Sequence, residues 1–90
     1  MSAVLLAPFE LTESMLGDTF PALTYRECEV LRWIIHGKTD PEIAGILGIC
    51  TLTASKHVQH LLAKLCVENR HAAAMEAVNV IICHRPPAAR

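Results

Sequence analysis

The sequence lacks most of the features that assign a function at first sight. Its uncharged stretches, such as Ala77 to Cys83, fall far short of the roughly 20 apolar residues that cross a bilayer. The N-terminus, MSAVLLAP, has no basic residue ahead of its apolar part, so we expect no secretory signal and a cytoplasmic protein. Neither a phosphate-binding loop nor a nucleophile–base pairing is visible, so the sequence does not indicate an enzyme.

A CxxC motif is also missing, because the four cysteines stand far apart at positions 28, 50, 66 and 83. Without a secretory signal we expect reduced thiols that behave as small apolar residues, rather than disulfides. A zinc site built from His57, His60 and Cys66 is conceivable. Zinc needs a tight cluster of ligands, however, and a surface or DNA-facing role suits the histidines better. We therefore expect no metal and no cofactor.

An excess of positive charge is absent as well. The chain has 8 Lys and Arg against 9 Asp and Glu, a net charge of −1 that normally argues against nucleic-acid binding. The charge is uneven, however. Residues 1–24 contain three acids and no lysine or arginine, whereas residues 50–66 contain two lysines, two histidines and no acid. The 52% apolar share excludes a disordered chain, and 90 residues allow one small domain.

Helix signals divide the middle of the chain. Thr24 and Glu27 form a capping-box pattern, apolar residues follow at 28, 30, 31, 34 and 35, and Gly37 ends this helix. A short second helix begins near Pro41, with Thr39 or Asp40 as its cap, and ends at Gly48. Apolar positions at 54, 58, 61, 62 and 65 predict a third helix over about 51–65.

A short helix, a tight turn and an amphipathic helix with a polar outer face are typical of a helix-turn-helix. Periodicity alone leaves open an ordinary helical bundle whose outer face is solvated. The segment from Arg70 to His84 is apolar on more than one side. Ala73, Ala77, Val80 and Ile81 can face the core, which leaves a second stripe uncovered. Either a partner helix or the N-terminal arm folding back would cover that stripe, which comprises Ala74, Met75, Val78 and Ile82.

Three stretches between Leu23 and Val80 form one longer pattern. They read Leu23-Thr24-x-Arg26-Glu27-x-Glu29-Val30-Leu31, then Gly37-Lys38-Thr39-Asp40-x-Glu42-Ile43-Ala44-x-x-Leu47-Gly48-Ile49, then Thr53-x-x-x-His57-Val58-x-x-Leu61-x-x-Lys64-Leu65-x-Val67-x-Asn69-Arg70-x-x-Ala73. In this order and spacing they resemble the LuxR-type (GerE-type) helix-turn-helix domain.

This resemblance implies an all-α, four-helix DNA-binding domain that works as a dimer on two-fold symmetric operators. The third helix would enter the major groove, and the fourth would pair with that of a second subunit. We divide the chain into an N-terminal arm or short extra helix over 1–22, the domain over 23–84, and a flexible tail over 85–90. Twenty-two residues hold no regulatory domain, so the chain is either a stand-alone regulator or a fragment of a longer protein. The start at Met1 favours the stand-alone regulator.

The resemblance also implies residue roles. Ser55, Lys56 and Gln59 look like the family's base-reading positions, and lysine and glutamine suit guanine and adenine. Phosphate contact or support of the third helix falls to Arg26, Lys38, Thr39, Thr53, His57, His60 and Lys64. Two of these have alternatives, because Arg26 could pair with a neighbouring glutamate and His57 could be wedged between helices. Asn69 looks like the cap of the fourth helix, and Arg70 like a packing or ion-pair residue.

Three positions depart from the family's pattern. Cys50 replaces a serine that caps the third helix well, so Thr51 is the alternative cap. Ser55 replaces a lysine and removes a positive charge from the groove face. Cys66 replaces a glycine before the fourth helix, which costs backbone strain if φ is positive there. These departures bear on binding strength more than on fold.

The leading hypothesis is a homodimeric, sequence-specific transcription regulator of bacterial type whose partners are double-stranded DNA and, beyond it, RNA polymerase. The alternative is a protein-interaction module that pairs with and modulates a larger LuxR-type regulator without strong DNA binding of its own. The near-neutral charge, Ser55 and the acidic N-terminal segment motivate this alternative.

Overall fold

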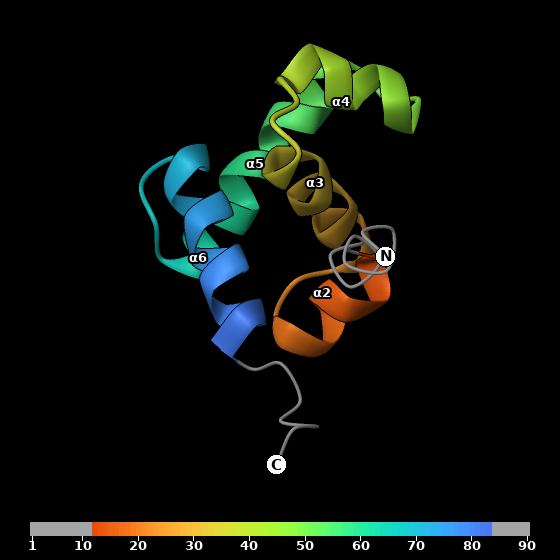
Figure 1. Ribbon diagram of the computed structural model, residues 1–90. Helices are drawn as coiled ribbons and strands as arrows, with labels where there is room; N and C mark the ends of the chain where they lie inside the picture. Colours follow the sequence, from red (N-terminus) through yellow and green to blue (C-terminus); the bar gives the residue numbers. More distant parts are fainter. Residues whose placement is uncertain (1–11, 84–90) are drawn as a thin grey trace, which may run out of the picture.

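The computed structural model describes residues 12–83, with the backbone alone for residues 81–83. This part of the chain is all-helical, which confirms the predicted fold class (Figure 1). Its helices are α2 (Glu13–Thr19), α3 (Tyr25–Ile35), α4 (Asp40–Leu47), α5 (Thr51–Leu65) and α6 (Arg70–Cys83). Helices α3 to α6 are the four expected ones, and α2 is the short extra helix. The rest of the N-terminal arm and the 85–90 tail lie outside the described residues.

Local capping interactions set the helix boundaries that the sequence predicts. At the start of α3, the Glu27 amide donates to Thr24 Oγ1 at 3.1 Å, and the Thr24 amide donates to Glu27 Oε1 at 2.9 Å. Thr39, rather than Asp40, caps α4 through the same reciprocal pair with Glu42. Asn69 Oδ1 accepts from the Ala72 amide at 2.8 Å, which confirms its capping role at α6. Each cap satisfies amides that a helix start leaves without partners.

The core lies around α3, against which α2, α5 and α6 pack (Figure 1). Its largest fully buried side chains are Leu16, Leu31, Ile43, Leu61 and Val30, so every helix from α2 to α5 contributes one. Helix α6 contributes the small residues Ala73 and Ala77, both fully buried. Small side chains let α6 approach α3 closely, and they leave its larger apolar residues for other faces.

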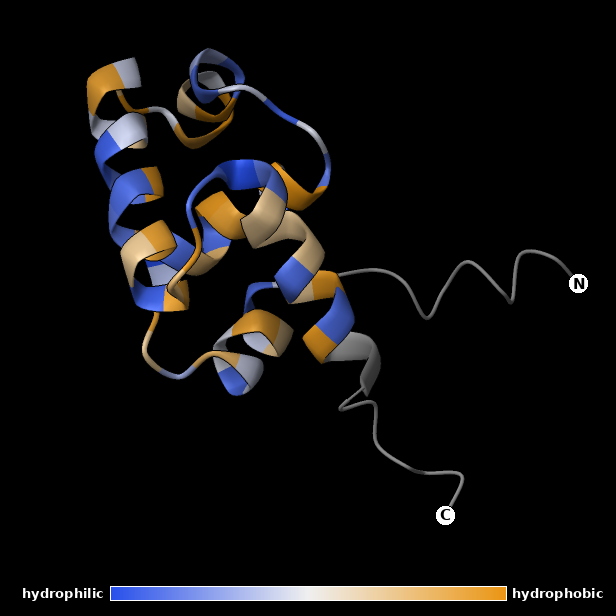
Figure 2. Cartoon of the chain, turned by 90° about the vertical axis from the view of Figure 1, so that its left-hand side faces the viewer, coloured by the Kyte–Doolittle hydropathy of each residue, from blue (hydrophilic) through white to orange (hydrophobic). Residues whose placement is uncertain are grey.

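Helices α4 and α5 form the helix-turn-helix. Gly48 ends α4 with φ +73°, a left-handed conformation that glycine adopts at little cost. The Ile49 amide then donates to the Ala44 carbonyl, and α5 begins after Cys50. Apolar and polar residues alternate around each helix, as expected of helices with one buried face (Figure 2).

None of the described helices is long and apolar enough to cross a membrane.

Candidate nucleic-acid interface

The outer face of α5 carries three exposed side chains in line, which are Leu52, Lys56 and Gln59. At about 100° per residue, these positions fall opposite the buried residues Ala54, Val58 and Leu61. The side chains of Lys56 and Gln59 form no hydrogen bond or ion pair with any described residue. Their polar groups are therefore available to a ligand that meets this face, and the groove of duplex DNA is wide enough for a helix.

Ser55 differs from its two predicted fellow base readers. It is half-buried at the side of α5 that faces α4, and its hydroxyl donates to Asp40 Oδ2 at 2.7 Å. Asp40 also accepts from Arg70 Nη1 at 2.5 Å. Burial raises the pKa of Asp40, but the bonds from Ser55 and Arg70 outweigh it and hold the pKa below its ordinary value. The serine therefore contributes a side-chain hydrogen bond between α5 and α4 in this structure.

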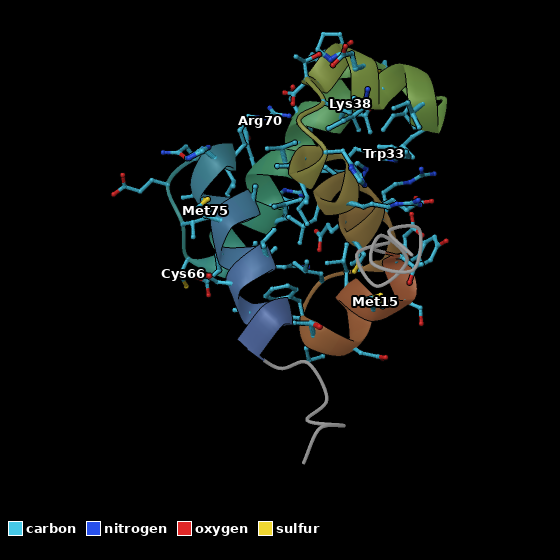
Figure 3. The ribbon with its side chains drawn as sticks, in the orientation of Figure 1. Met15, Trp33, Lys38, Cys66, Arg70 and Met75 are labelled. Carbon is cyan, nitrogen blue, oxygen red and sulfur yellow. The ribbon has the colours of Figure 1, made fainter. Side chains whose placement is uncertain are left out.

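Arg70 connects the start of α6 to the same cluster. Its other terminal nitrogen, Nη2, donates to the Lys38 carbonyl at 2.8 Å. The guanidinium therefore joins the start of α6 to the loop between α3 and α4 (Figure 3). The predicted ion-pair role of Arg70 is confirmed. The chain Arg70–Asp40–Ser55 links α6, α4 and α5 through one carboxylate, which the sequence did not indicate.

Lys64 lies in the last turn of α5, away from the end that carries Leu52. Its ammonium donates to Glu27 Oε1 at 2.7 Å, the same oxygen that completes the α3 capping box. Burial raises the pKa of Glu27, but the bonds from Lys64 and the Thr24 amide lower it by more. The pKa therefore lies below its ordinary value, and the charged carboxylate is stabilised. The contact of Lys64 with Glu27 therefore joins the end of α5 to the start of α3.

The remaining predicted contact residues lie around α5 and at the start of α3. Thr39 caps α4, and Lys38 precedes it in the loop. Thr53 Oγ1 lies 3.1 Å from Cys50 Sγ, His57 is half-buried and His60 is exposed. Arg26 pairs with Glu29 at 3.0 Å, the alternative that the sequence left open.

The two cysteines that replace usual residues have different consequences. Cys50 is the N-cap of α5 but makes no side-chain capping bond, and Thr51 lies inside the helix, so the expectation that Thr51 caps instead is wrong. The bond with Thr53 lowers the pKa of the Cys50 thiol. Cys66 ends α5 at φ 59°, which confirms that this position requires the left-handed conformation.

Helix α6 presents an apolar face beside the α3–α4 loop. Met75 and Val78 are exposed and Ala74 is half-buried, whereas Ala73 and Ala77 are buried in the core. Together with the end of α3, this face forms a shallow, mostly apolar groove lined by Ile34, Ile35, Gly37, Lys38, Thr39, Arg70, His71, Ala74, Met75 and Val78. The side chain of Ile82, the fourth predicted interface residue, lies outside the described residues.

Two residues of this region have surroundings that the sequence pattern does not predict. Asp40, one of the two cap candidates of α4, is the acceptor that joins Ser55 and Arg70. Leu52 is 64% exposed in the first turn of α5. Within residues 12–80, no group of three His, Cys, Asp or Glu side chains could hold a metal ion.

Comparison with known proteins supports the helix-turn-helix interpretation. Residues 21–77 match the family described as bacterial regulatory proteins, luxR family. No solved structure gives a significant match.

Several curated proteins are similar to this chain. It is 45% identical to the transcriptional activator protein PhzR of Pseudomonas fluorescens over 67 residues, which cover 74% of this chain and 28% of PhzR. It is 38% identical over 80 residues to SolR of Ralstonia nicotianae, also named a transcriptional activator protein, covering 89% of this chain and 34% of SolR. VjbR of Brucella abortus, named a quorum sensing-dependent transcriptional regulator, is 42% identical over 64 residues, which cover 71% of this chain and 25% of VjbR. The chain thus spans between 25% and 34% of these relatives' length.

Proposed function

Because the chain belongs to the luxR family of bacterial regulatory proteins, we propose that it binds double-stranded DNA and regulates transcription. The observation that carries the proposal is the outer face of α5, where Lys56 and Gln59 are exposed and have no partner among the described residues. No acid lies anywhere in α5, so a phosphate backbone would meet no repulsion from that helix. The proposal places α5 in the major groove with its N-terminal half toward the bases.

Within this interface we assign different roles to the predicted residues. Lys56 and Gln59 read base edges, since lysine donates to guanine and glutamine pairs with adenine. Ser55 acts mainly through Asp40 and contributes little direct readout. Arg26 and Lys64 each form an ion pair with a glutamate, so we assign them to stabilising the fold rather than to binding phosphate. Phosphate contacts fall to the remaining predicted residues, Lys38, Thr39, Thr53, His57 and His60.

The apolar face of α6 supports a homodimer on a two-fold symmetric operator. Met75 and Val78 are exposed beside a groove, and a symmetric pair of α6 helices would bury both. Ile82 follows in the same helical register, so we include it in this interface. Dimerisation would double the base contacts, which matters because each subunit offers few positive charges.

A binding titration tests the DNA-binding proposal. Operator fragments selected from genomic DNA should bind with an affinity that falls as salt rises, with a slope of about −0.9 for each phosphate neutralised. Lys56→Ala should weaken binding by about 1–3 kcal/mol per half-site, the usual discrimination of one good base contact. Lys56→Arg is the matched control, because arginine also reaches guanine O6 and N7 and should retain most of the affinity.

A different result would favour the second candidate function. The net charge of −1 and the engagement of Ser55 motivate a module that pairs with a larger LuxR-type regulator. If the intact chain shows no DNA binding at low salt but associates tightly with a longer relative, the DNA-binding proposal is wrong and the interaction module takes its place. The DNA titration is repeated with the longer relative present, and its result is compared with that of the chain alone.

A further inference from the structure

Leu52 is the most conspicuous side chain on the outer face of α5 that the proposed function leaves unused. It is the second residue of the helix and is 64% exposed, although the other large apolar side chains of α5 are buried or half-buried. Leaving a leucine in water forgoes the stabilisation that its burial would give. Among residues 12–80, Leu52 does not belong to the packed core.

The position of Leu52 on α5 indicates which ligand would cover its side chain. It lies in the first turn of α5, one turn before Lys56 and on the same face, so the two side chains are neighbours. In a helix-turn-helix, the N-terminal residues of the second helix are the ones that reach base edges. Ser55, three residues further on, is short, and its hydroxyl donates to Asp40. No long side chain at that position would therefore separate Leu52 from the bases of the DNA major groove.

We infer that Leu52 is a specificity-determining residue that packs against the 5-methyl group of a thymine in each operator half-site. The inference rests on the proposed DNA binding and adds the identity of one base. Thymine is the unmodified base that presents a methyl group in the major groove, and apolar side chains recognise it by contact. The face then combines one apolar contact from Leu52 with polar contacts from Lys56 and Gln59.

Uracil substitution tests this assignment directly, because uracil keeps every hydrogen-bonding group of thymine and lacks only the methyl. Each thymine of a selected operator is replaced in turn, at the symmetric positions of both half-sites, and the Kd is measured. For the intact chain, one position should lose about fourfold in affinity per half-site, the value expected for one buried methyl-sized group. For Leu52→Ala, the same substitution should leave the Kd unchanged.

A matched control comes from the neighbouring helix. Ile46 on α4 is also an exposed large apolar residue, at 47%, but it lies off the outer face of α5. Ile46→Ala should retain the full thymine-to-uracil ratio. Because the readout is a ratio of two Kd values on one protein, partial unfolding of a variant raises both apparent Kd values by the same factor and does not imitate the effect.

The outcomes separate this inference from the proposed function. If the chain binds DNA but no uracil substitution changes the Kd, Leu52 does not read a methyl group. If Leu52→Ala weakens binding equally to the thymine and uracil forms of the operator while the intact chain also shows no difference between them, the leucine does not contact the methyl group, and the inference is again overturned. If the intact chain binds no DNA, the proposed function fails and the inference fails with it.

Discussion

At the scale of single residues, Cys66 shows the cost of one departure from the family's pattern. Its φ of 59° places a residue with a Cβ in the left-handed region, where the side chain crowds the following carbonyl. The geometry is fixed because the Cys66 amide donates to the Ala63 carbonyl and the Val67 amide to the Leu62 carbonyl. The chain therefore adopts the turn that a glycine would favour.

Replacing Cys66 with glycine should stabilise the domain. Relief of the left-handed conformation is worth about 1–2 kcal/mol. The greater freedom of glycine in the unfolded chain offsets about 0.4–1 kcal/mol of this. We expect a net gain of about 1 kcal/mol in the free energy of unfolding, measured by urea denaturation under reducing conditions. Cys66→Ala is the control, since alanine keeps the Cβ. An equal gain for alanine would show that the thiol, and not the backbone, limits stability.

The sequence predicted the exposed residues of the interface better than their partners. Lys56 and Gln59 follow from helical periodicity, because both stand opposite the apolar stripe. The bonds of Ser55 to Asp40 and of Lys64 to Glu27 join residues 15 and 37 positions apart, and no local pattern encodes them. Helical periodicity puts Leu52 near the outer face as well, but the pattern does not reveal how exposed that side chain is.

At the scale of secondary-structure elements, the accurate predictions are those that depend on neighbouring residues. The boundaries of α3 and α4 follow from capping boxes that span four residues each. Helix α2 is different, because its short sequence left a helix and an irregular arm equally open. Tertiary contacts decide between them: Leu16 is fully buried, and Glu13 pairs with Arg32 of α3 at 3.1 Å. Sequence periodicity cannot supply such contacts.

The Glu27–Lys64 pair predicts how stability depends on pH. Its partners lower the pKa of Glu27 in the folded chain below the ordinary value of 4.5. The folded state therefore binds fewer protons than the unfolded state, so this stabilisation is complete above pH 4.5 and is lost as the pH falls through the lower, folded pKa. Glu27→Gln should lower stability at neutral pH and flatten the decline below pH 4.5, as measured by urea denaturation across that range.

A carboxylate elsewhere provides the comparison for this pH effect. Glu76 is exposed on α6 and its carboxylate forms no ion pair with any described residue, so Glu76→Gln should leave the shape of the acid decline unchanged. If Glu27→Gln shows the same decline as the unsubstituted chain, other carboxylates cause the acid sensitivity. Asp40, whose pKa Ser55 and Arg70 also lower, is the next group to substitute.

At the scale of the whole molecule, the net charge of −1 agrees with an interface that offers few free positive charges. Lys64 and Arg70 are committed to Glu27 and Asp40, which leaves Lys56 as the only unpaired cation of α5 among lysine and arginine side chains. One subunit would therefore bind DNA weakly. Two subunits joined through α6 would place two such faces on one operator, so binding should depend on dimerisation.

Val78→Glu tests that dependence. It places a charge on the exposed apolar face of α6, and in a symmetric dimer the two new carboxylates would face each other across a desolvated contact. We expect sedimentation to give a dimer for the intact chain and a monomer for Val78→Glu, together with a large loss of operator affinity. Asn79→Glu is the control, since it adds the same charge about 100° further around the helix and should stay dimeric.

The two measurements together decide how the assembly and the interface are related. A monomer that still binds a single half-site with the same base preference would show that α5 reads DNA independently and that α6 adds affinity only. A dimer whose mass is unchanged by Val78→Glu would move the subunit contact away from Met75 and Val78. The groove beside α6 would then be open to another partner, and a longer relative of the same family becomes the first one to test.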